Sequence, residues 1–234
     1  MRRHQQVLDR IHRFALIQCA EHFGGFQTDF LGCGQERKVG VQAAGLFVVV
    51  AGADLGDEGN TLLRFAGDQA ELGVDFQPFN AMHDIGNAIN RSRHAEYGGL
   101  LANEILKQYD LSVPDRITIV SAISNHDEST GGAVDPISAA LIIGDKTDVR
   151  RSRVREKPKA SFDIHDRVNY AVTDQTLKIN TEKKVISLNL QIDTDICSMY
   201  EYFEIFLQRM LMCRGAADML GATFKLTANG AKVL

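Results

Sequence analysis

The sequence predicts a mostly α-helical protein that ends in a small α+β unit. Three observations support this fold class. Between about residues 95 and 153, apolar side chains recur at helical spacing, and prolines stand where two of the helices should begin. After about residue 175 the period changes to the alternation that is typical of strands. The pair Asn229–Gly230 near the C-terminal end is a strong hairpin signal.

Three helices are expected in the helical part. The first covers residues 95–108, and the second covers 113–125 with a proline in its first turn. The third begins with Asp135 as N-cap and Pro136 at the first helical position, and should run to about Arg153. Their apolar faces predict one packed helical body.

The C-terminal part is expected to be an antiparallel sheet with one long helix. Residues 185–192 alternate apolar and polar side chains, so one face of the sheet should be exposed. The long helix should place six apolar residues in the core, and exposed aromatic side chains on it would instead indicate a homodimer face. The expected strands are 176–180, 185–192, 224–227 and 232–234, the helix is 199–220 with Gly221 after its end, and the six core residues are Tyr200, Phe203, Phe206, Leu207, Met210 and Leu211.

The first third of the chain has a different composition from the rest. Lys38 is the only lysine before Lys107, and no isoleucine lies between Ile17 and Ile85. We therefore divide the chain into an atypical N-terminal segment, a helical core and a C-terminal annex. These parts are residues 1–80, 81–160 and 161–234, and within the first a helix over 5–23 and a short strand over 46–51 are expected.

The overall composition excludes several classes of protein. The chain has 234 residues, of which 44% are hydrophobic and 24% charged, and this is typical of a globular protein and not of a disordered one. The net charge of −4 gives no general reason to expect nucleic acid or an acidic membrane as partner. The sequence contains no apolar run long enough to cross a bilayer and no secretory signal. We therefore expect a cytoplasmic protein with reduced cysteines.

The candidate chemistry lies in the helical part, where histidines and aspartates recur near predicted helix ends. They are His83, Asp84, His94, His126 and Asp145. Imidazole and carboxylate are ligands for divalent metals, and facing helices can direct them into one bundle core. Asp145 falls on the apolar face of its helix, where a carboxylate needs a metal or another cation as partner. The alternative is that these are ordinary polar residues with separate hydrogen-bond partners.

Four motifs resemble the HD superfamily of metal-dependent phosphohydrolases. The segment MHDIGN (82–87) is similar to the histidine–aspartate signature of that family. His94 in RHAEYGGLLANEIL matches the family histidine that opens the helix after the signature. His126 in IVSAISNHDE matches the family histidine at the end of the helix that comes next. Asp145 in ISAALIIGDKTD matches the family's distal aspartate. The resemblance covers roughly residues 80–155 and implies an HD-type helical bundle.

The resemblance also implies a metal site and an activity. His83, Asp84 and Asp145 would bind one divalent ion, and His94 and His126 a second one, with Asp84 able to bridge. The ion could be Mn, Fe, Mg, Ni or Zn, present once or twice. The implied reaction is hydrolysis of a small, nucleotide-like phosphoester by metal-activated water, with Asp84 and His83 as the catalytic pair. Neither a nucleic acid nor a membrane is implied as partner.

A basic run follows Asp145. Lys146, Arg150 and Arg153 are spaced to share one helical face, so they are candidate substrate-binding residues for a phosphate group. The alternative is a solvated helix end, where cations are favourable in any case. One of Asp127 and Glu128 could be a general base or an outer partner that orients an imidazole, and the alternative is a charged loop. We interpret His165–Asp166 as a structural pair or cap.

One expected ligand of the HD pattern is missing. The family has a further histidine about thirty residues before the signature, and residues 55–61 contain none. Three explanations are open: a remote histidine returns in space, an acidic residue substitutes, or the segment before residue 81 is not the native N-terminal part, for example through a frameshift. The candidates are His4, His12 and His22 for the first explanation and Asp57 and Glu58 for the second. The alternative function is a catalytically impaired ligand-binding or regulatory module.

Overall fold

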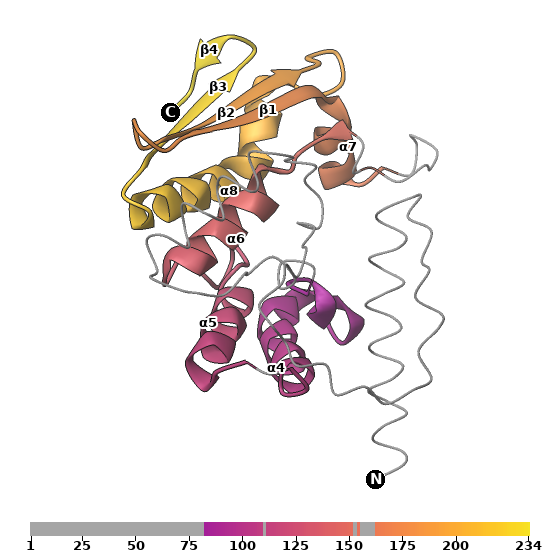
Figure 1. The fold of residues 1–234 in the computed structure, drawn as a ribbon. Coiled ribbons are helices and arrows are strands. Elements are labelled where there is room, and N and C mark those ends of the chain that lie inside the picture. Colours follow the sequence, from indigo (N-terminus) through magenta and orange to yellow (C-terminus); the bar gives the residue numbers. More distant parts are fainter. Residues whose placement is uncertain (1–81, 110, 152–153, 155–161) are drawn as a thin grey trace, which may run out of the picture.

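A computed structural model describes residues 82–109, 111–151, 154 and 162–234 of the chain (Figure 1). The N-terminal segment 1–80, with the helix and strand expected in it, lies outside the described residues, as do Arg153 and the candidate replacement ligands. Five α-helices, two short 3-10 helices and one four-stranded sheet form the described part, which is compatible with the expected mostly helical protein and its small C-terminal sheet. None of these helices combines the length and apolar character that a membrane crossing requires.

The helical part contains two short 3-10 helices followed by three α-helices. Their bounds are η1 Ile85–Ala88, η2 Arg91–Arg93, α4 His94–Leu106, α5 Val113–Ser124 and α6 Pro136–Thr147. Ser112 caps α5 by accepting from the Asp115 N–H, and Asp135 caps α6 in a capping box with Ser138. The predicted starts of both helices are therefore confirmed, because each is determined by a short polar cap and a following proline.

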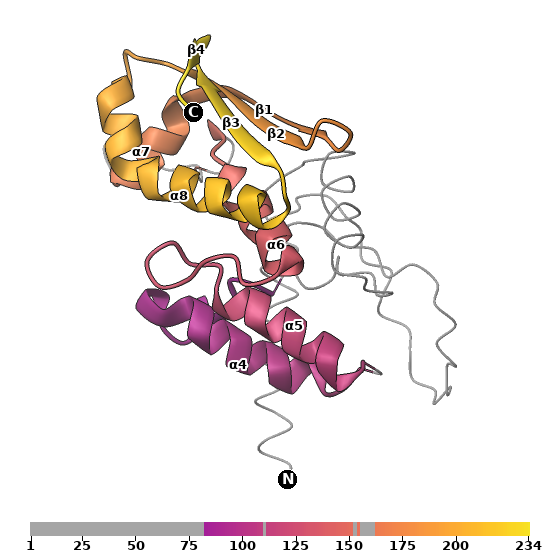
Figure 2. The ribbon, with the colours of Figure 1, turned by 90° about the vertical axis from the view of Figure 1, so that its left-hand side faces the viewer.

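Helix α6 lies at the centre of the described part of the chain. Its residues from Ile137 to Thr147 are all buried, and it packs against both α5 and α8. Figure 2 shows α6 between the α4–α5 pair and the long helix α8 below the sheet. A helix buried on every side needs apolar residues all round, which the segment PISAALIIG supplies.

The C-terminal part consists of two helices and four strands. Their bounds are α7 Ile164–Ala171, β1 Val172–Asn180, β2 Val185–Ile192, α8 Met199–Met219, β3 Thr223–Ala228 and β4 Ala231–Lys232. Helix α7 is absent from the sequence prediction. It is capped by Asp163 with Asp166 at its third position, so Asp166 has the capping role that we expected of the His165–Asp166 pair. Because α7 is only eight residues long, its periodicity was too brief to recognise.

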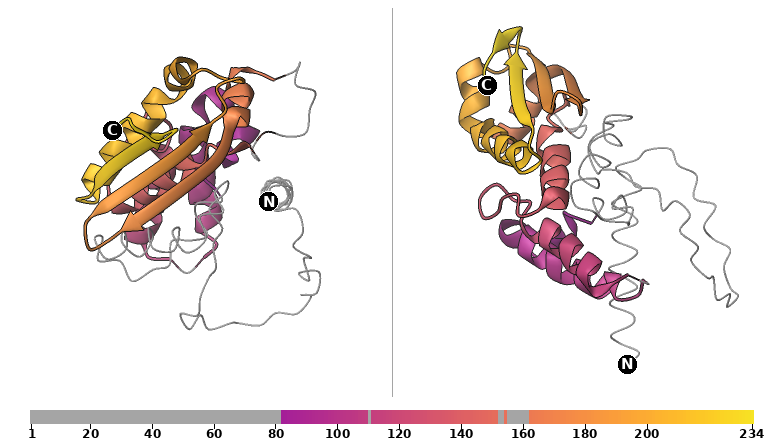
Figure 3. Two further views of the ribbon diagram at one scale, coloured as in Figure 1. Left: turned by 90° about the horizontal axis from the view of Figure 1, so that it is seen from above. Right: turned by 60° about the vertical axis from the view of Figure 1, so that its left-hand side comes forward.

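The strand order is β1-β2-β3-β4, and the prediction of an antiparallel sheet is wrong for one of the three pairings. Strand β2 pairs antiparallel with β1 but parallel with β3, and β3 pairs antiparallel with β4. The reason is that α8 connects β2 to β3 and returns the chain to the end of the sheet where β2 began, as a helical crossover does. Seen from above, the strands extend across the helices (Figure 3).

One face of the sheet packs on α8, as the alternation in β2 predicted. The core under the sheet consists of Ile186, Leu188, Leu190, Phe224 and Leu226 on the strands and of Tyr202, Phe206, Met210 and Cys213 on α8. Among the core residues predicted on α8, Tyr200 and Leu207 are wrong, because they are exposed. Both cysteines in the described part, Cys197 and Cys213, are free and buried, as expected.

Two turns depend on backbone conformations that favour glycine and asparagine. Gly221 ends α8 with a φ of 62°, and Asn229 and Gly230 have φ values of 49° and 79° in the β3–β4 hairpin. The Asn229 side chain also accepts from the Ile192 N–H at 2.7 Å and donates to the Ile192 carbonyl at 2.9 Å. The predicted hairpin is thus confirmed, and its asparagine ties β2 to the C-terminal end.

Candidate metal centre

All five predicted ligands converge, although they come from four separate segments. His83 and Asp84 lie in the turn before η1, and His94 is the first residue of α4. His126 follows the C-terminal end of α5, and Asp145 lies near the C-terminal end of α6. Each side chain is therefore fixed at the end of an element, where packing of the helices brings the ends together.

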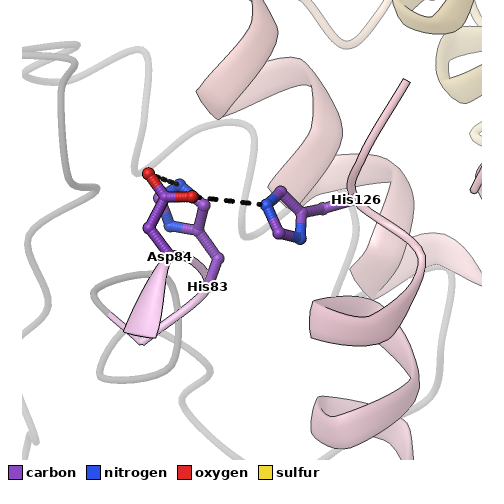
Figure 4. Close-up of side chains that lie close together, drawn as sticks. All are labelled: His83, Asp84 and His126. Carbon is purple, nitrogen blue, oxygen red and sulfur yellow. Dashed lines mark ion pairs between the residues drawn. The ribbon is translucent and has the colours of Figure 1, made fainter. Parts of the chain in front are cut away.

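Asp84 is at the centre of the group. One carboxylate oxygen, Oδ2, lies 3.5 Å from His83 Nε2. The other, Oδ1, lies 3.4 Å from His94 Nε2 and 3.7 Å from His126 Nε2. His83, Asp84 and His126 each offer a ligand atom within 4.8 Å of the others (Figure 4), a spacing that could hold one metal ion.

Asp145 joins the group through His83, because its Oδ1 lies 3.5 Å from His83 Nε2. The two sets implied by the family resemblance are therefore both present at one place. His83, Asp84 and Asp145 form one set, and His94 and His126 form the other. Asp84 connects the two sets, because its Oδ2 faces His83 of its own set and its Oδ1 faces His94 and His126 of the other.

The tautomers of two histidines follow from their backbone contacts. His94 Nδ1 lies 3.0 Å from the Arg91 carbonyl oxygen, and His126 Nδ1 lies 2.6 Å from the Ile123 carbonyl oxygen. A carbonyl oxygen only accepts, so each Nδ1 carries the proton and each Nε2 of the neutral ring presents a lone pair. The two Nε2 atoms nevertheless face each other at 3.1 Å. Two lone pairs at this distance require a shared cation, either a proton or a metal ion.

The site is buried on one side and open on the other. His83 is 2% exposed, His126 is 1% exposed and Asp145 is 7% exposed. The side chain of Asp84, in contrast, is 45% exposed. Among the five candidate ligands, Asp84 therefore has the most exposed side chain.

Both carboxylates are held in the ionised form that metal ions bind. Burial acts to raise the pKa of Asp84, but the neighbouring His83 and His126 outweigh it and lower that pKa below its ordinary value. Burial likewise acts to raise the pKa of Asp145, and Lys146 and His83 overcome it, so that this pKa lies well below its ordinary value. The donor set of three imidazoles and two carboxylates thus fits a divalent metal without thiolate ligands.

Two adjacent glycines let the ligand-bearing segments approach α4. A Cβ atom on Gly98 would lie 2.9 Å from the His83 carbonyl oxygen, and one on Gly86 would lie 1.9 Å from the His94 carbonyl oxygen. At Gly99, which follows Gly98 on α4, a Cβ atom would lie 2.0 Å from Ser124 Oγ of α5. The Gly98–Gly99 pair is therefore a signal for the site that our reading of the sequence missed.

The helix that should carry the predicted phosphate-binding face ends earlier than expected. Helix α6 ends at Thr147, so Lys146 and Arg150 do not share a helical face, and Arg153 lies outside the described residues. Lys146 is 3% exposed, and its ammonium group contacts Asp145 Oδ2 at 2.8 Å and Glu128 Oε2 at 2.7 Å. Lys146 is therefore a partner of the candidate ligand Asp145, and its role in substrate binding stays a prediction.

Arg150 has a partner of its own. Its Nε donates to Asp148 Oδ1 at 2.9 Å, and Asp148 is fully buried at the end of α6. The end of the helix is set there by tertiary contacts, because the Val149 N–H donates to the Gln175 side chain of β1. With a side chain that is 33% exposed, Arg150 keeps its role in substrate binding only as a prediction.

Two acidic residues after His126 have different surroundings. Asp127 Oδ2 lies 3.7 Å from His94 Nε2, at the margin of the group. Glu128 accepts from Arg209 Nε of α8 at 3.0 Å and also contacts Lys146. Arg209 is not among the site residues predicted from the sequence, although an arginine three residues after the core residue Phe206 on an amphipathic helix is a usable signal.

The chain was compared with family models, curated proteins and solved structures, and none of them matches. The candidate metal centre is therefore supported by the convergence, the burial and the tautomers of its own residues.

Proposed function

We propose that this protein is an HD-type, divalent-metal-dependent phosphohydrolase that cleaves a phosphoester of a small, nucleotide-like molecule. The order of the ligand motifs along the chain supports the HD assignment. The convergence of His83, Asp84, His94, His126 and Asp145 supports the metal site.

The single observation that carries the proposal is the pair His94–His126. Their Nε2 atoms are 3.1 Å apart while both Nδ1 atoms face backbone carbonyl oxygens. This arrangement presents two lone pairs to one point in space. A structural role as hydrogen-bond partners would instead require a proton between the two Nε2 atoms, carried by one ring as an imidazolium, because both Nδ1 protons already face carbonyl oxygens.

Each residue of the centre has a proposed role. His83, Asp84 and Asp145 would hold one ion, His94 and His126 a second, and Asp84 would contact both. When bound, such ions supply an acidified water and neutralise charge on phosphoryl oxygens. Asp84, as the half-exposed ligand, marks the side on which a phosphoester would enter.

A second candidate is a ligand-binding or regulatory module without turnover. One observation favours it: among the described residues, the first set has only His83, Asp84 and Asp145 as donors, and Lys146 contacts one oxygen of Asp145. That contact leaves only the other oxygen of Asp145, Oδ1, facing the centre. Such a module would bind the ion and a phosphorylated ligand but release no product.

Activity of the full chain distinguishes the two. The purified protein is loaded with Mn²⁺, its metal content is measured, and hydrolysis of bis-p-nitrophenyl phosphate and of nucleoside monophosphates is followed. The phosphohydrolase predicts turnover that depends on Mn²⁺ and is abolished in Asp84→Asn. Metal binding without turnover of any phosphoester would favour the regulatory module.

The matched control is Asp218→Asn, which changes an exposed carboxylate on α8. It should leave metal content and hydrolysis at the wild-type level. Hydrolysis that survives in Asp84→Asn would contradict the metal mechanism, and a wild-type protein that binds no divalent ion would contradict the site itself.

A further inference from the structure

A chain of four charged side chains leads from the metal centre to helix α8. Asp145 contacts Lys146 at 2.8 Å, Lys146 contacts Glu128 at 2.7 Å, and Glu128 contacts Arg209 at 3.0 Å. The charges alternate along the chain, so every neighbouring pair is attractive. Three parts of the fold are joined: α6, the segment after α5, and α8 of the C-terminal unit.

The geometry at Asp145 shows what this chain of contacts does to the candidate ligand. Lys146 takes Oδ2, while Oδ1 faces His83 Nε2 at 3.5 Å. The two oxygens therefore have different neighbours, and the carboxylate cannot rotate without losing the contact with Lys146. One oxygen is directed to the metal centre and the other is held away from it.

Lys146 can hold Asp145 only if Lys146 itself is fixed. Its side chain is 4% exposed, and a buried ammonium group needs partners for more than one of its N–H donors. Glu128 is the second partner, and its other carboxylate oxygen is taken by Arg209. The Arg209 guanidinium also lies over the ring of Phe206, 4.8 Å from its centroid, so it is anchored on α8.

Glu128 also connects Arg209 to a second ligand. It follows His126 by two residues in the same short segment. Arg209 is therefore linked to two ligands, to Asp145 through Glu128 and Lys146, and to His126 through Glu128 and the backbone.

We infer that Arg209 and Glu128 are positioning residues of the metal centre, which makes the C-terminal unit a part of its support. This inference rests on the proposed metal site. Partners beyond the direct ligands typically change metal affinity by about 10- to 100-fold when they are removed.

The test is Mn²⁺ affinity and the visible spectrum of bound Co²⁺ in Arg209→Met of the full chain. Methionine keeps an unbranched stem over Phe206 but removes the charge and the Nε–H donor. We expect metal binding about tenfold weaker and a changed Co²⁺ spectrum. Arg209→Lys, which restores the charge, should recover part of the affinity. Arg214→Met, an exposed arginine on the same helix, should match the wild type.

The outcomes separate this inference from the proposed function. A wild type that binds neither Mn²⁺ nor Co²⁺ overturns both. A wild type that binds them with Arg209→Met unchanged in affinity and spectrum overturns only the role of Arg209. If Arg209→Met fails to fold, Glu128→Gln removes the same link with almost no change in shape, and wild-type affinity and spectrum in that variant overturn the inference.

Discussion

Gly98 of α4 lies so close to His83 that a Cβ atom at this position would be 2.9 Å from the His83 carbonyl oxygen. The absence of a side chain is thus what allows the turn with His83 and Asp84 to rest on α4, next to His94.

Gly98→Ala should therefore disturb both stability and the metal centre. We expect a loss of about 1–3 kcal/mol in the free energy of unfolding, as in overpacked sites, and weaker Mn²⁺ binding because His83 is displaced. Urea unfolding and a metal titration measure the two effects. Gly215→Ala is the matched control, since its Cβ meets nothing within 4 Å and the glycine lies inside α8. It should stabilise the protein by about 0.5–1 kcal/mol. Equal behaviour of the two variants would contradict the close-packing explanation.

The facing pair His94–His126 predicts that either histidine is needed for metal. His94→Asn and His126→Asn should each lower Mn²⁺ affinity by about 100-fold or more, beyond the range of indirect partners. Equilibrium dialysis with metal analysis measures this. His165→Asn changes an exposed histidine on α7 and should bind metal as the wild type does. Unchanged binding in both site variants would show that the pair is a structural contact.

Lys146 separates two explanations of the basic run. As a partner of Asp145, its replacement in Lys146→Met should weaken metal binding by about tenfold or more. If Lys146 is instead a phosphate ligand, Lys146→Met should raise KM for a phosphoester and leave the metal affinity unchanged. Metal titration together with steady-state kinetics distinguishes the two, and Lys107→Met at an exposed position on the far end of α4 is the control.

Glu128 predicts a pH dependence of stability. Burial acts to raise the pKa of its carboxyl, but Lys146 and Arg209 outweigh it and lower that pKa to about 2. A carboxyl whose pKa is lower in the folded than in the unfolded state stabilises the protein above the unfolded value of about 4.3, and this contribution is lost as the pH falls toward 2. At pH 7 the free energy of unfolding of the wild type should be about 1–3 kcal/mol higher than that of Glu128→Gln. The difference should shrink between pH 5 and pH 3, which denaturant unfolding at each pH measures. A stability difference between the two proteins that does not change with pH would contradict this role of Glu128.

Cys213 should be unreactive in the folded protein. Burial raises the pKa of its thiol to about 12, so almost no thiolate is present at neutral pH. Mass spectrometry after iodoacetamide treatment should find Cys213 alkylated only in urea. Rapid alkylation in native buffer would show that the core under the sheet opens readily.

Much of the fold could be predicted because it depends on local chemistry. The proline at the start of α5, the Asp135 cap of α6, the alternation in β2 and the Asn229–Gly230 hairpin are each determined by a few adjacent residues. The candidate ligands could be named for the same reason, since their motifs are short. The short helix α7 was missed because eight residues carry too weak a period.

By itself, the sequence determined where most elements begin and which imidazoles and carboxylates form the candidate centre. Only the tertiary structure decided that α6 ends at Thr147, that β3 is parallel to β2 and that Lys146 belongs to Asp145 and Glu128. Each of these depends on a partner far along the chain: Gln175 for the segment after α6, α8 as a crossover for the sheet, and Arg209 for the buried charges. Spacing along a helix cannot reveal such partners, because their positions are set by how the helices and the sheet pack.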